Sequence, residues 1–174
     1  MNDILVQVVD EHDNPIGGAS KAEIHKKGLW HRISRIVLED GNGHILLQRR
    51  KDNDGRLWEG CWDTSAAGHV DEGETHYQAA VRELEEEIGL TGATLTEVAY
   101  YKTEGTYGER ILNRWNRLYR GVISHDARLR LQEEEVAETK WFTRTELSEL
   151  FETSPTKVSD GLRETYGLLF KDEL

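Results

Sequence analysis

Three glutamates on one expected helix are the residues of this chain best suited to do chemistry. Glu83, Glu86 and Glu87 lie at positions i, i+3 and i+4, so their carboxylates would project from one helix face, one turn apart. Like charges at this spacing repel each other, and a divalent cation between them would reverse the sign of the interaction. Hard oxygen ligands favour Mg²⁺ or Mn²⁺ over zinc. The alternative for such a run is an acidic helix face exposed to solvent.

The glutamates belong to a longer pattern with fixed spacing. Residues 68–90 follow G-x5-E-x7-R-E-U-x-E-E-x-G-U, where U is aliphatic, and the specified positions are Gly68, Glu74, Arg82, Glu83, Leu84, Glu86, Glu87, Gly89 and Leu90. Apolar residues recur at helical spacing before Gly89, and a glycine is suited to end a helix in the left-handed conformation. The pattern predicts a helix over about 75–88, and its fixed offsets favour a functional site over a solvated acidic face.

Several strands and helices must position this helix. Alternating apolar runs between turn residues predict strands at 4–9, 32–39, 44–50, 62–67, 95–103, 111–124 and 140–142. Capping residues and helical spacing predict further helices at about 22–25, 143–151 and 158–171. Strands mixed with helices, without regular alternation, indicate an α+β or mixed sandwich fold.

Composition narrows the class of protein. The chain has 174 residues, 37% of them hydrophobic, and is expected to form a single domain over 1–174. Its net charge of −11 argues against a nucleic-acid polymer as partner. The single cysteine, Cys61, excludes a disulfide within the chain and fits a reducing compartment. The chain has neither a long apolar run nor the features of a signal peptide, so we expect a cytoplasmic protein without a membrane span.

The pattern at 68–90 resembles the Nudix box, the signature of enzymes that hydrolyse diphosphates linked to another moiety. The resemblance implies an α/β/α sandwich with a mixed β-sheet. It also implies that Mg²⁺ (or Mn²⁺) is bound by the carbonyl of Gly68 and by Glu83, Glu86 and Glu87. Arg82 would hold a glutamate in place, because its planar fork engages a carboxylate at two points. Glu74 would support the site or the substrate.

The family often uses one further glutamate outside the box, and Glu135 is the first candidate for it, followed by Glu134. The alternative for this acidic run is an exposed loop. A carboxylate, Glu86, Glu87 or Glu135, would activate water as general base. Arg50, rather than its strand neighbour, is expected to reach a substrate phosphate. The expected partner is a small-molecule diphosphate, and a homodimer is left open.

A narrower resemblance covers most of the chain. The segments 4–50, 57–69 and 131–142 look like the isopentenyl-diphosphate-isomerase branch of the superfamily, in which three metal-binding histidines match His25, His31 and His69. These histidines are therefore candidates for a second metal site.

The chain departs from the isomerase at functional positions. Ala67 stands where the isomerase has its catalytic cysteine, and Asn113 and Asn116 replace an expected pair of glutamates. Alanine cannot move protons, so we expect a hydrolase. An isomerase of a short isoprenoid diphosphate and a non-catalytic nucleotide-binding module are the alternatives.

Overall fold

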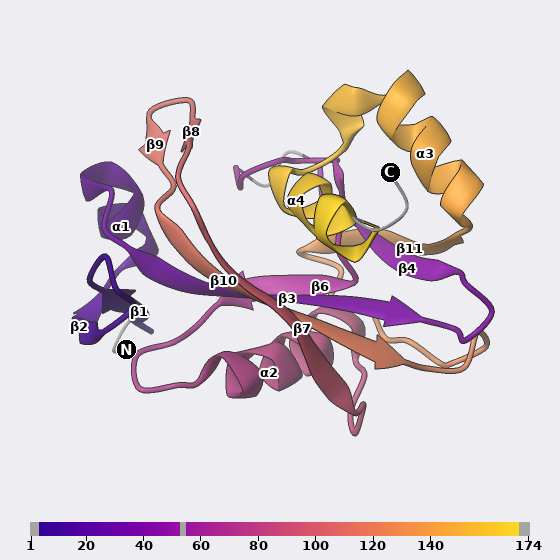
Figure 1. Cartoon of the computed structure of the whole chain (residues 1–174), viewed down its shortest axis with the longest axis horizontal. Coiled ribbons are helices and arrows are strands. Elements are labelled where there is room, and N and C mark those ends of the chain that lie inside the picture. The colour runs from indigo at the N-terminus through magenta and orange to yellow at the C-terminus, as the bar shows by residue number, and fades with distance from the viewer. Residues whose placement is uncertain (1–3, 53–54, 171–174) are drawn as a thin grey trace.

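The central strand of the fold is β3 (His31–Glu39), which is buried along most of its length. The structure is a computed structural model that describes residues 4–52 and 55–170. Strand β3 pairs antiparallel with β1, β4 and β6 and parallel with β10, which makes the nine-stranded sheet mixed. Figure 1 shows α2 on one face of the sheet and α3 and α4 on the other. The predicted α/β/α sandwich is confirmed.

The remaining elements extend this sheet or cover it. The other strands are β1 (Val6–Val9), β2 (Pro15–Ala19), β4 (Ile45–Arg50), β5 (Trp62–Asp63), β6 (Ala66–His69), β7 (Leu95–Thr103), β8 (Thr106–Tyr107), β9 (Arg110–Ile111), β10 (Arg114–Val122) and β11 (Val136–Phe142). The helices are α1 (Lys21–Lys27), α2 (His76–Ile88), α3 (Arg144–Thr153) and α4 (Asp160–Leu169), with a 3-10 turn η1 (Pro155–Lys157).

Alternation along β3 divides the core between the two faces of the sheet. Ile36 and Leu38 belong to a cluster that packs on Leu84 and Ile88 of α2, whereas Val37 belongs to the cluster that reaches α3 and α4. Successive side chains of a strand point to opposite faces, so one strand supplies both clusters. The first cluster fixes α2, and with it the glutamates of the box, against the sheet.

Two expected strands are interrupted. Residues 62–67 divide into β5, which pairs with β4, and β6, which pairs with β3. Between them the buried hydroxyl of Ser65 donates to Leu46 O (2.6 Å) and accepts from the backbone N–H of Leu38 (2.8 Å). The expected strand 111–124 is likewise divided, because β9 pairs with β8 in a separate hairpin. The last helix begins at Asp160, where Ser159 caps it; residue 171, its expected end, lies outside the described residues.

Candidate active site

The sequence of α2 determines which glutamates face the protein. The helix begins with a capping box between Thr75 and Gln78 and ends at Gly89, whose φ of 69° is the left-handed conformation. Because the apolar stripe of α2 faces the sheet, the adjacent glutamates differ in exposure. The side chain of Glu83 is 12% exposed and that of Glu86 is 55% exposed, while Glu87 is buried.

Glu87 is a buried carboxylate that is hydrogen-bonded at one oxygen. Its Oε2 accepts from Gln48 Nε2 on β4 (2.9 Å) and from the backbone N–H of Ala67 on β6 (3.1 Å). Burial, together with the nearby charge of Glu83, raises the pKa of Glu87 well above its ordinary value. A cation close to this carboxylate would favour its ionised form.

Glu83 lies against the backbone of β6 at Gly68. A Cβ atom added to Gly68 would lie 1.9 Å from Glu83 Oε1, so a larger residue there would collide with the carboxylate. Burial, the largest influence, also raises the pKa of Glu83, although Arg82 opposes the shift. The first glycine of the box is therefore required by the close approach of the helix and the strand.

Arg82 connects the glutamates of the box to the loop that precedes α2. Its guanidinium binds both oxygens of Glu74, and the same group donates to His69 O (2.9 Å). Its Nη1 also donates to Glu83 Oε1 (2.7 Å) and Glu86 Oε2 (3.2 Å). Arg82 thus holds not one glutamate but three.

The donor set fits a hard divalent cation. Glu83, Glu86 and Glu87 offer carboxylate oxygens from one helix, and Gly68 brings its backbone close to Glu83. Glu87 is buried without an ion pair among the described contacts, as expected of a group that a cation would neutralise. In the arrangement seen here, Arg82 engages the carboxylates of Glu83 and Glu86.

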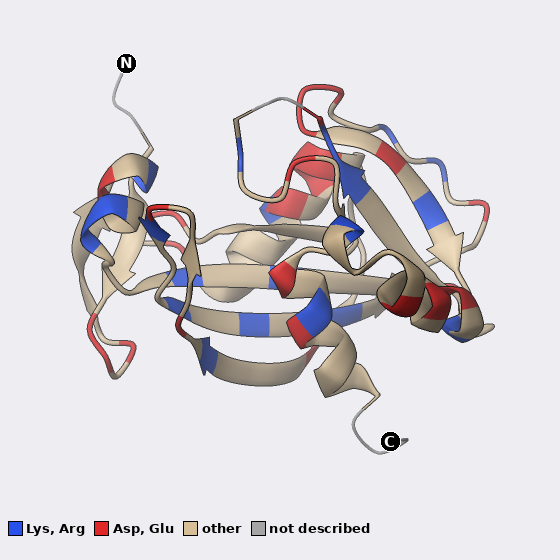
Figure 2. Cartoon of the chain, turned by 90° about the horizontal axis from the view of Figure 1, so that it is seen from above, with Lys and Arg blue, Asp and Glu red and all other residues tan. Residues whose placement is uncertain are grey.

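A cavity of about 740 Å³ opens beside this helix. Its lining includes Gly68, Glu83 and Glu87 from the box, whereas Glu74, Arg82 and Glu86 are outside the described lining. Although acidic residues outnumber basic ones in the chain, the lining carries seven basic residues: Lys21, Lys26, Arg35, Arg50, Arg56, Arg110 and Arg114. Figure 2 shows basic residues on the strands of the sheet as well as on helices, and acidic ones mainly on helices and loops. Such a cavity combines carboxylates for a metal with cations for phosphate oxygens.

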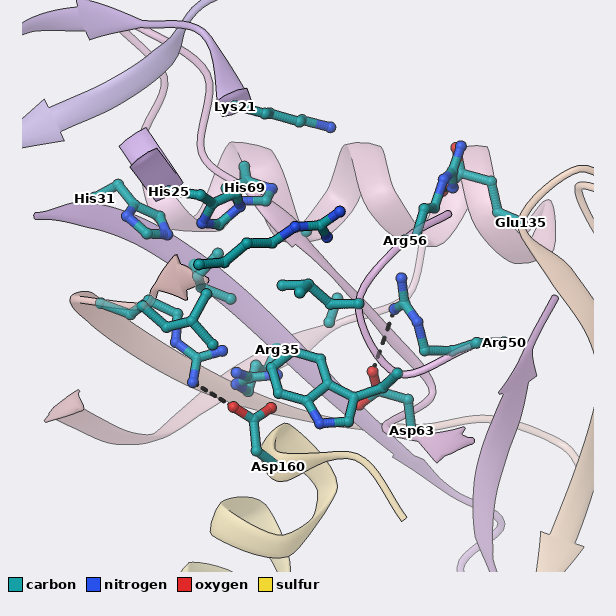
Figure 3. A pocket seen from close by; sticks show the side chains of 18 of the residues that line it. Lys21, His25, His31, Arg35, Arg50, Arg56, Asp63, His69, Glu135 and Asp160 are labelled. Atoms are coloured by element: carbon teal, nitrogen blue, oxygen red, sulfur yellow. Dashed lines mark hydrogen bonds and ion pairs between the residues drawn. The ribbon is translucent and has the colours of Figure 1, made fainter. Parts of the chain in front are cut away.

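Arg50 is the arginine of its pair that faces the cavity. Its Nη1 donates to Asp63 Oδ2 on β5 (3.3 Å), and Figure 3 shows both side chains at the cavity wall. The Arg49 side chain instead pairs with Glu138 (2.6 Å) and Asp52 (2.8 Å), and Arg49 does not line the cavity. The opposite orientation of adjacent side chains follows from the alternation of β4.

Glu135 lines the same cavity, and it forms an ion pair with Arg56. Figure 3 shows the two side chains together at the edge of the site. The backbone fixes Glu135, since its carbonyl accepts from Lys51 N–H (2.8 Å) and its N–H donates to Gln132 O (3.0 Å). Glu134, the second candidate, is exposed and is not part of the cavity lining.

The structure brings His25, His31 and His69 together at another part of the cavity (Figure 3). Their ring centroids are 5.3–5.7 Å apart, and each ring has a buried nitrogen without a hydrogen-bond partner among the residues that the structure describes. Burial lowers the pKa of all three, that of His31 to about 3, so the imidazoles are neutral. Neutral imidazoles can bind a transition metal, and the second metal site stays a prediction.

Asn113 and Asn116, which stand in place of the isomerase's pair of glutamates, do not face the cavity. Asn113 donates to Gly28 O (2.8 Å) and Asn116 to Thr103 Oγ1 (3.0 Å), and neither lines the cavity. The lining residues near them include Leu112 and Arg114, and the charge of Arg114 contributes to the lowered pKa of the histidines. A cation therefore stands beside the three imidazoles, which opposes a metal ion at that place.

Sequence reasoning missed a largely buried ionic network in the wall of the cavity. Arg114 pairs with Asp160 (2.5 Å) and Glu164 (3.5 Å) of α4, and Arg35 lies 3.7 Å from Glu164. The sequence feature that could have revealed this network is Arg35, an arginine at a position of β3 where alternation predicts a buried side chain. Gln48, which donates a hydrogen bond to Glu87, is likewise a polar residue at a buried position of a strand, directly after the apolar residues of β4.

Comparison with known sequences shows the family to which the chain belongs. The NUDIX domain family matches residues 29–162. The chain is 38% identical over 148 residues to an uncharacterized Nudix hydrolase of Pseudomonas aeruginosa, covering 83% of this chain and 80% of the relative. It is 34% identical over 156 residues to isopentenyl-diphosphate Delta-isomerase 2 of Photorhabdus laumondii, covering 89% and 85%. The chain therefore belongs to the Nudix family. It is a Nudix hydrolase of the isomerase-like branch.

Solved structures show the same fold at low sequence identity. The crystal structure of DR0079 from Deinococcus radiodurans has a TM-score of 0.75 at 19% identity and covers 92% of this chain and 95% of its own. The NUDIX domain of Shewanella oneidensis NrtR, in complex with ADP ribose, has a TM-score of 0.63 at 15% identity, covering 90% and 100%. In the part of this chain that the structure describes, no helix is long and apolar enough to cross a membrane.

Proposed function

We propose that this protein is a Mg²⁺-dependent (or Mn²⁺-dependent) hydrolase of a small molecule in which a diphosphate is linked to another moiety, such as a nucleoside di- or triphosphate. One observation carries the proposal. Glu83, Glu87 and Gly68 of an intact Nudix box lie in the wall of a cavity that also carries seven basic residues. Carboxylates alone would repel a diphosphate, and basic residues alone would bind it without a metal.

Each part of the site has a role in this proposal. Glu83, Glu86 and Glu87, with the carbonyl of Gly68, would hold the metal, which when bound offsets the charge of the diphosphate and orients it for in-line attack. Arg82 is a positioning residue, because it fixes Glu74 and borders Glu83 and Glu86.

The basic residues of the cavity would bind the phosphates. Arg50 faces the cavity on the same strand that carries Gln48, the hydrogen-bond partner of Glu87. Its guanidinium can therefore hold a phosphate oxygen while the diphosphate lies near the carboxylates of α2.

A carboxylate would act as the general base. It takes a proton from water as the water oxygen attacks phosphorus, and the phosphorus–oxygen bond to the leaving group breaks. The candidates are Glu86, Glu87 and Glu135. Glu87 and Glu135 line the cavity, whereas Glu86 is half-exposed and is outside the described lining. Burial raises the pKa of Glu87, and a bound cation would favour the ionised form of this carboxylate.

A second candidate function is isomerisation of a short isoprenoid diphosphate. It is favoured by the gathering of His25, His31 and His69 and by the similarity to isomerases. It is opposed by Ala67, which offers no group that can move a proton at the position of the isomerase's cysteine. Cys61 does not line the cavity, and burial raises the pKa of its thiol. We therefore place hydrolysis first.

The test is product identification by mass spectrometry. The pure protein would be incubated with Mg²⁺ and a panel of nucleoside di- and triphosphates, nucleotide sugars, dinucleotides and isopentenyl diphosphate. Cleavage of one or a few members supports the proposal, and the fragments show which bond breaks. Conversion of isopentenyl to dimethylallyl diphosphate without cleavage would replace hydrolysis by isomerisation. Metal-dependent binding of a nucleotide without turnover would instead support a binding module.

A further inference from the structure

A second group of metal-ligating side chains lies outside the active-site cavity. Asp40 follows β3, His44 precedes β4, and His125 follows β10. Among the described residues, these three form a group in which one ligand atom from each side chain lies within 4.8 Å of the others. None of the three lines the active-site cavity.

The group is at the opposite end of the central strand from the histidines of the active site. His31 begins β3 and Asp40 follows its last residue, so nine residues of extended chain separate them, or roughly 30 Å. Figure 1 shows this end of β3 far from α1 and the β8–β9 hairpin. The group is therefore independent of the Nudix chemistry.

Asp40 presents one carboxylate oxygen to both imidazoles. Its Oδ2 lies 2.6 Å from His44 Nδ1 and 2.8 Å from His125 Nδ1. Its other oxygen accepts from the backbone N–H groups of Asn42 (2.8 Å) and His44 (3.1 Å), which fixes the carboxylate within the turn. Burial opposes ionisation, but the hydrogen bonds from His125, the turn and His44 outweigh it and hold the pKa of Asp40 well below its ordinary value.

The two histidines are also held by their surroundings. The His125 ring stacks on Trp141 of β11 at 4.9 Å between centroids, and Trp141 Nε1 donates to His125 O (3.0 Å). The His44 ring meets the His125 ring edge-on at 5.3 Å. The side chain of Asp40 is 1% exposed, whereas those of His44 and His125 are 34% and 54% exposed, so solvent can reach the two histidines.

We propose that Asp40, His44 and His125 form a binding site for a borderline divalent transition-metal ion such as Zn²⁺. The ligands would be Asp40 Oδ2 and the Nδ1 atoms of both histidines, with water completing the coordination. Two imidazoles and one carboxylate suit zinc, whereas Mg²⁺ prefers an all-oxygen set. The ion would connect the β3–β4 turn to the segment after β10, and its role is to stabilise this end of the sheet.

Zinc titrations of the metal-stripped protein test the site. Isothermal titration calorimetry would be carried out with excess Mg²⁺ present, on the wild type and on His125→Ala, His44→Ala and His12→Ala. His12 is a matched control, because it is an exposed histidine on another turn. We expect His125→Ala and His44→Ala to weaken one zinc equivalent at least about tenfold, since even indirect partners of a metal contribute this much. His12→Ala should bind zinc as the wild type does.

Two further readouts report on the same group. Zinc should raise the melting temperature of the wild type and of His12→Ala more than that of His125→Ala, because an ion that binds only the folded state stabilises it. Ni²⁺ should quench the fluorescence of Trp141, and Trp141→Phe should remove that quenching.

Wild-type zinc affinity and stabilisation in both His44→Ala and His125→Ala, with circular dichroism showing intact folds, would overturn the proposal. The group would then be a hydrogen-bonded surface cluster only. Because His125 does not line the cavity, Mg²⁺-dependent turnover should be the same in His125→Ala and the wild type.

Discussion

The guanidinium of Arg82 binds the carboxylate of Glu74 through two parallel hydrogen bonds, Nε to Oε1 and Nη2 to Oε2, each 3.0 Å long. Glu74 in turn accepts from the backbone N–H of Asp71 (3.0 Å), so the pair ties α2 to the loop before it. The side chain of Glu74 is only 17% exposed. The first glutamate of the box therefore serves to orient Arg82, which borders the carboxylates that we assign to the metal.

Arg82→Lys should weaken the site without unfolding it. A lysine keeps the charge but cannot bind Glu74 at two points. We expect the Mg²⁺ concentration for half-maximal turnover to rise about 10- to 100-fold, as for other residues that orient metal ligands. Arg120→Lys, an exposed arginine paired with Glu39, is the control and should behave as wild type. An unchanged Mg²⁺ dependence in Arg82→Lys would show that the two-point contact has no part in metal binding.

Arg50 and Arg49 provide a matched pair for substrate binding. Arg50→Gln should lower kcat/KM about 10- to 100-fold, because a hydrogen bond to a charged group contributes roughly 1.5–3 kcal/mol. Arg49→Gln removes two ion pairs to exposed carboxylates, with Asp52 and Glu138, and should have little effect. The measurement is kcat/KM of both variants, from steady-state kinetics on the substrate found by mass spectrometry. Equal losses in the two variants would contradict the assignment of Arg50 to the substrate.

Cys61→Ala should leave turnover unchanged. The thiol is 7% exposed, lies 3.5 Å from Thr156 O and is outside the cavity lining. Burial raises its pKa, so it is a poor nucleophile at neutral pH. A large loss of turnover in a variant with an unchanged melting temperature would revive a thiol mechanism, and with it the isomerase.

His76 should make the fold sensitive to acid. Burial lowers its pKa from 6.5 to about 4 in the folded protein. The unfolded chain therefore binds the proton first, and the stability present above pH 6.5 is lost as the pH falls towards 4. Between pH 7 and pH 5 this loss is about 2 kcal/mol. Urea unfolding of metal-free wild type and of His76→Phe at both pH values should show a smaller loss in the variant, and equal losses would contradict this origin.

Much of the fold could be predicted because its signals are local. The box helix, expected over 75–88, is His76–Ile88 in the structure, since Thr75 and Gly89 mark its ends. Strand β7 has the bounds expected for it, 95–103. The strand boundaries that were predicted wrongly depend on tertiary contacts. The expected strand 62–67 is broken because Ser65 forms hydrogen bonds to β3 and β4, which no local pattern reveals.

The site could be predicted only in part for the same reason. The spacing of the box predicted Glu83 and Glu87 as site residues, but it did not predict which residues of other elements share the cavity with them. Arg114 and Asp160 are 46 residues apart and meet only because β10 and α4 converge at the cavity. Likewise, the buried carboxylate of Glu87 accepts a hydrogen bond from Gln48 of β4, which is distant in the sequence.

The carboxylates of α2 are the centre of this account, and turnover of Glu87→Gln and Glu86→Gln tests them most directly. Each variant would be assayed with Mg²⁺ on the substrate identified by mass spectrometry. Glu85→Gln, an exposed neighbour on the same helix, serves as control. We predict that Glu86→Gln and Glu87→Gln lower kcat by roughly 10²- to 10⁴-fold, with melting temperatures that show intact folds, whereas Glu85→Gln is unaffected. Near-normal turnover in Glu86→Gln and Glu87→Gln would contradict the assignment of the box carboxylates to the reaction.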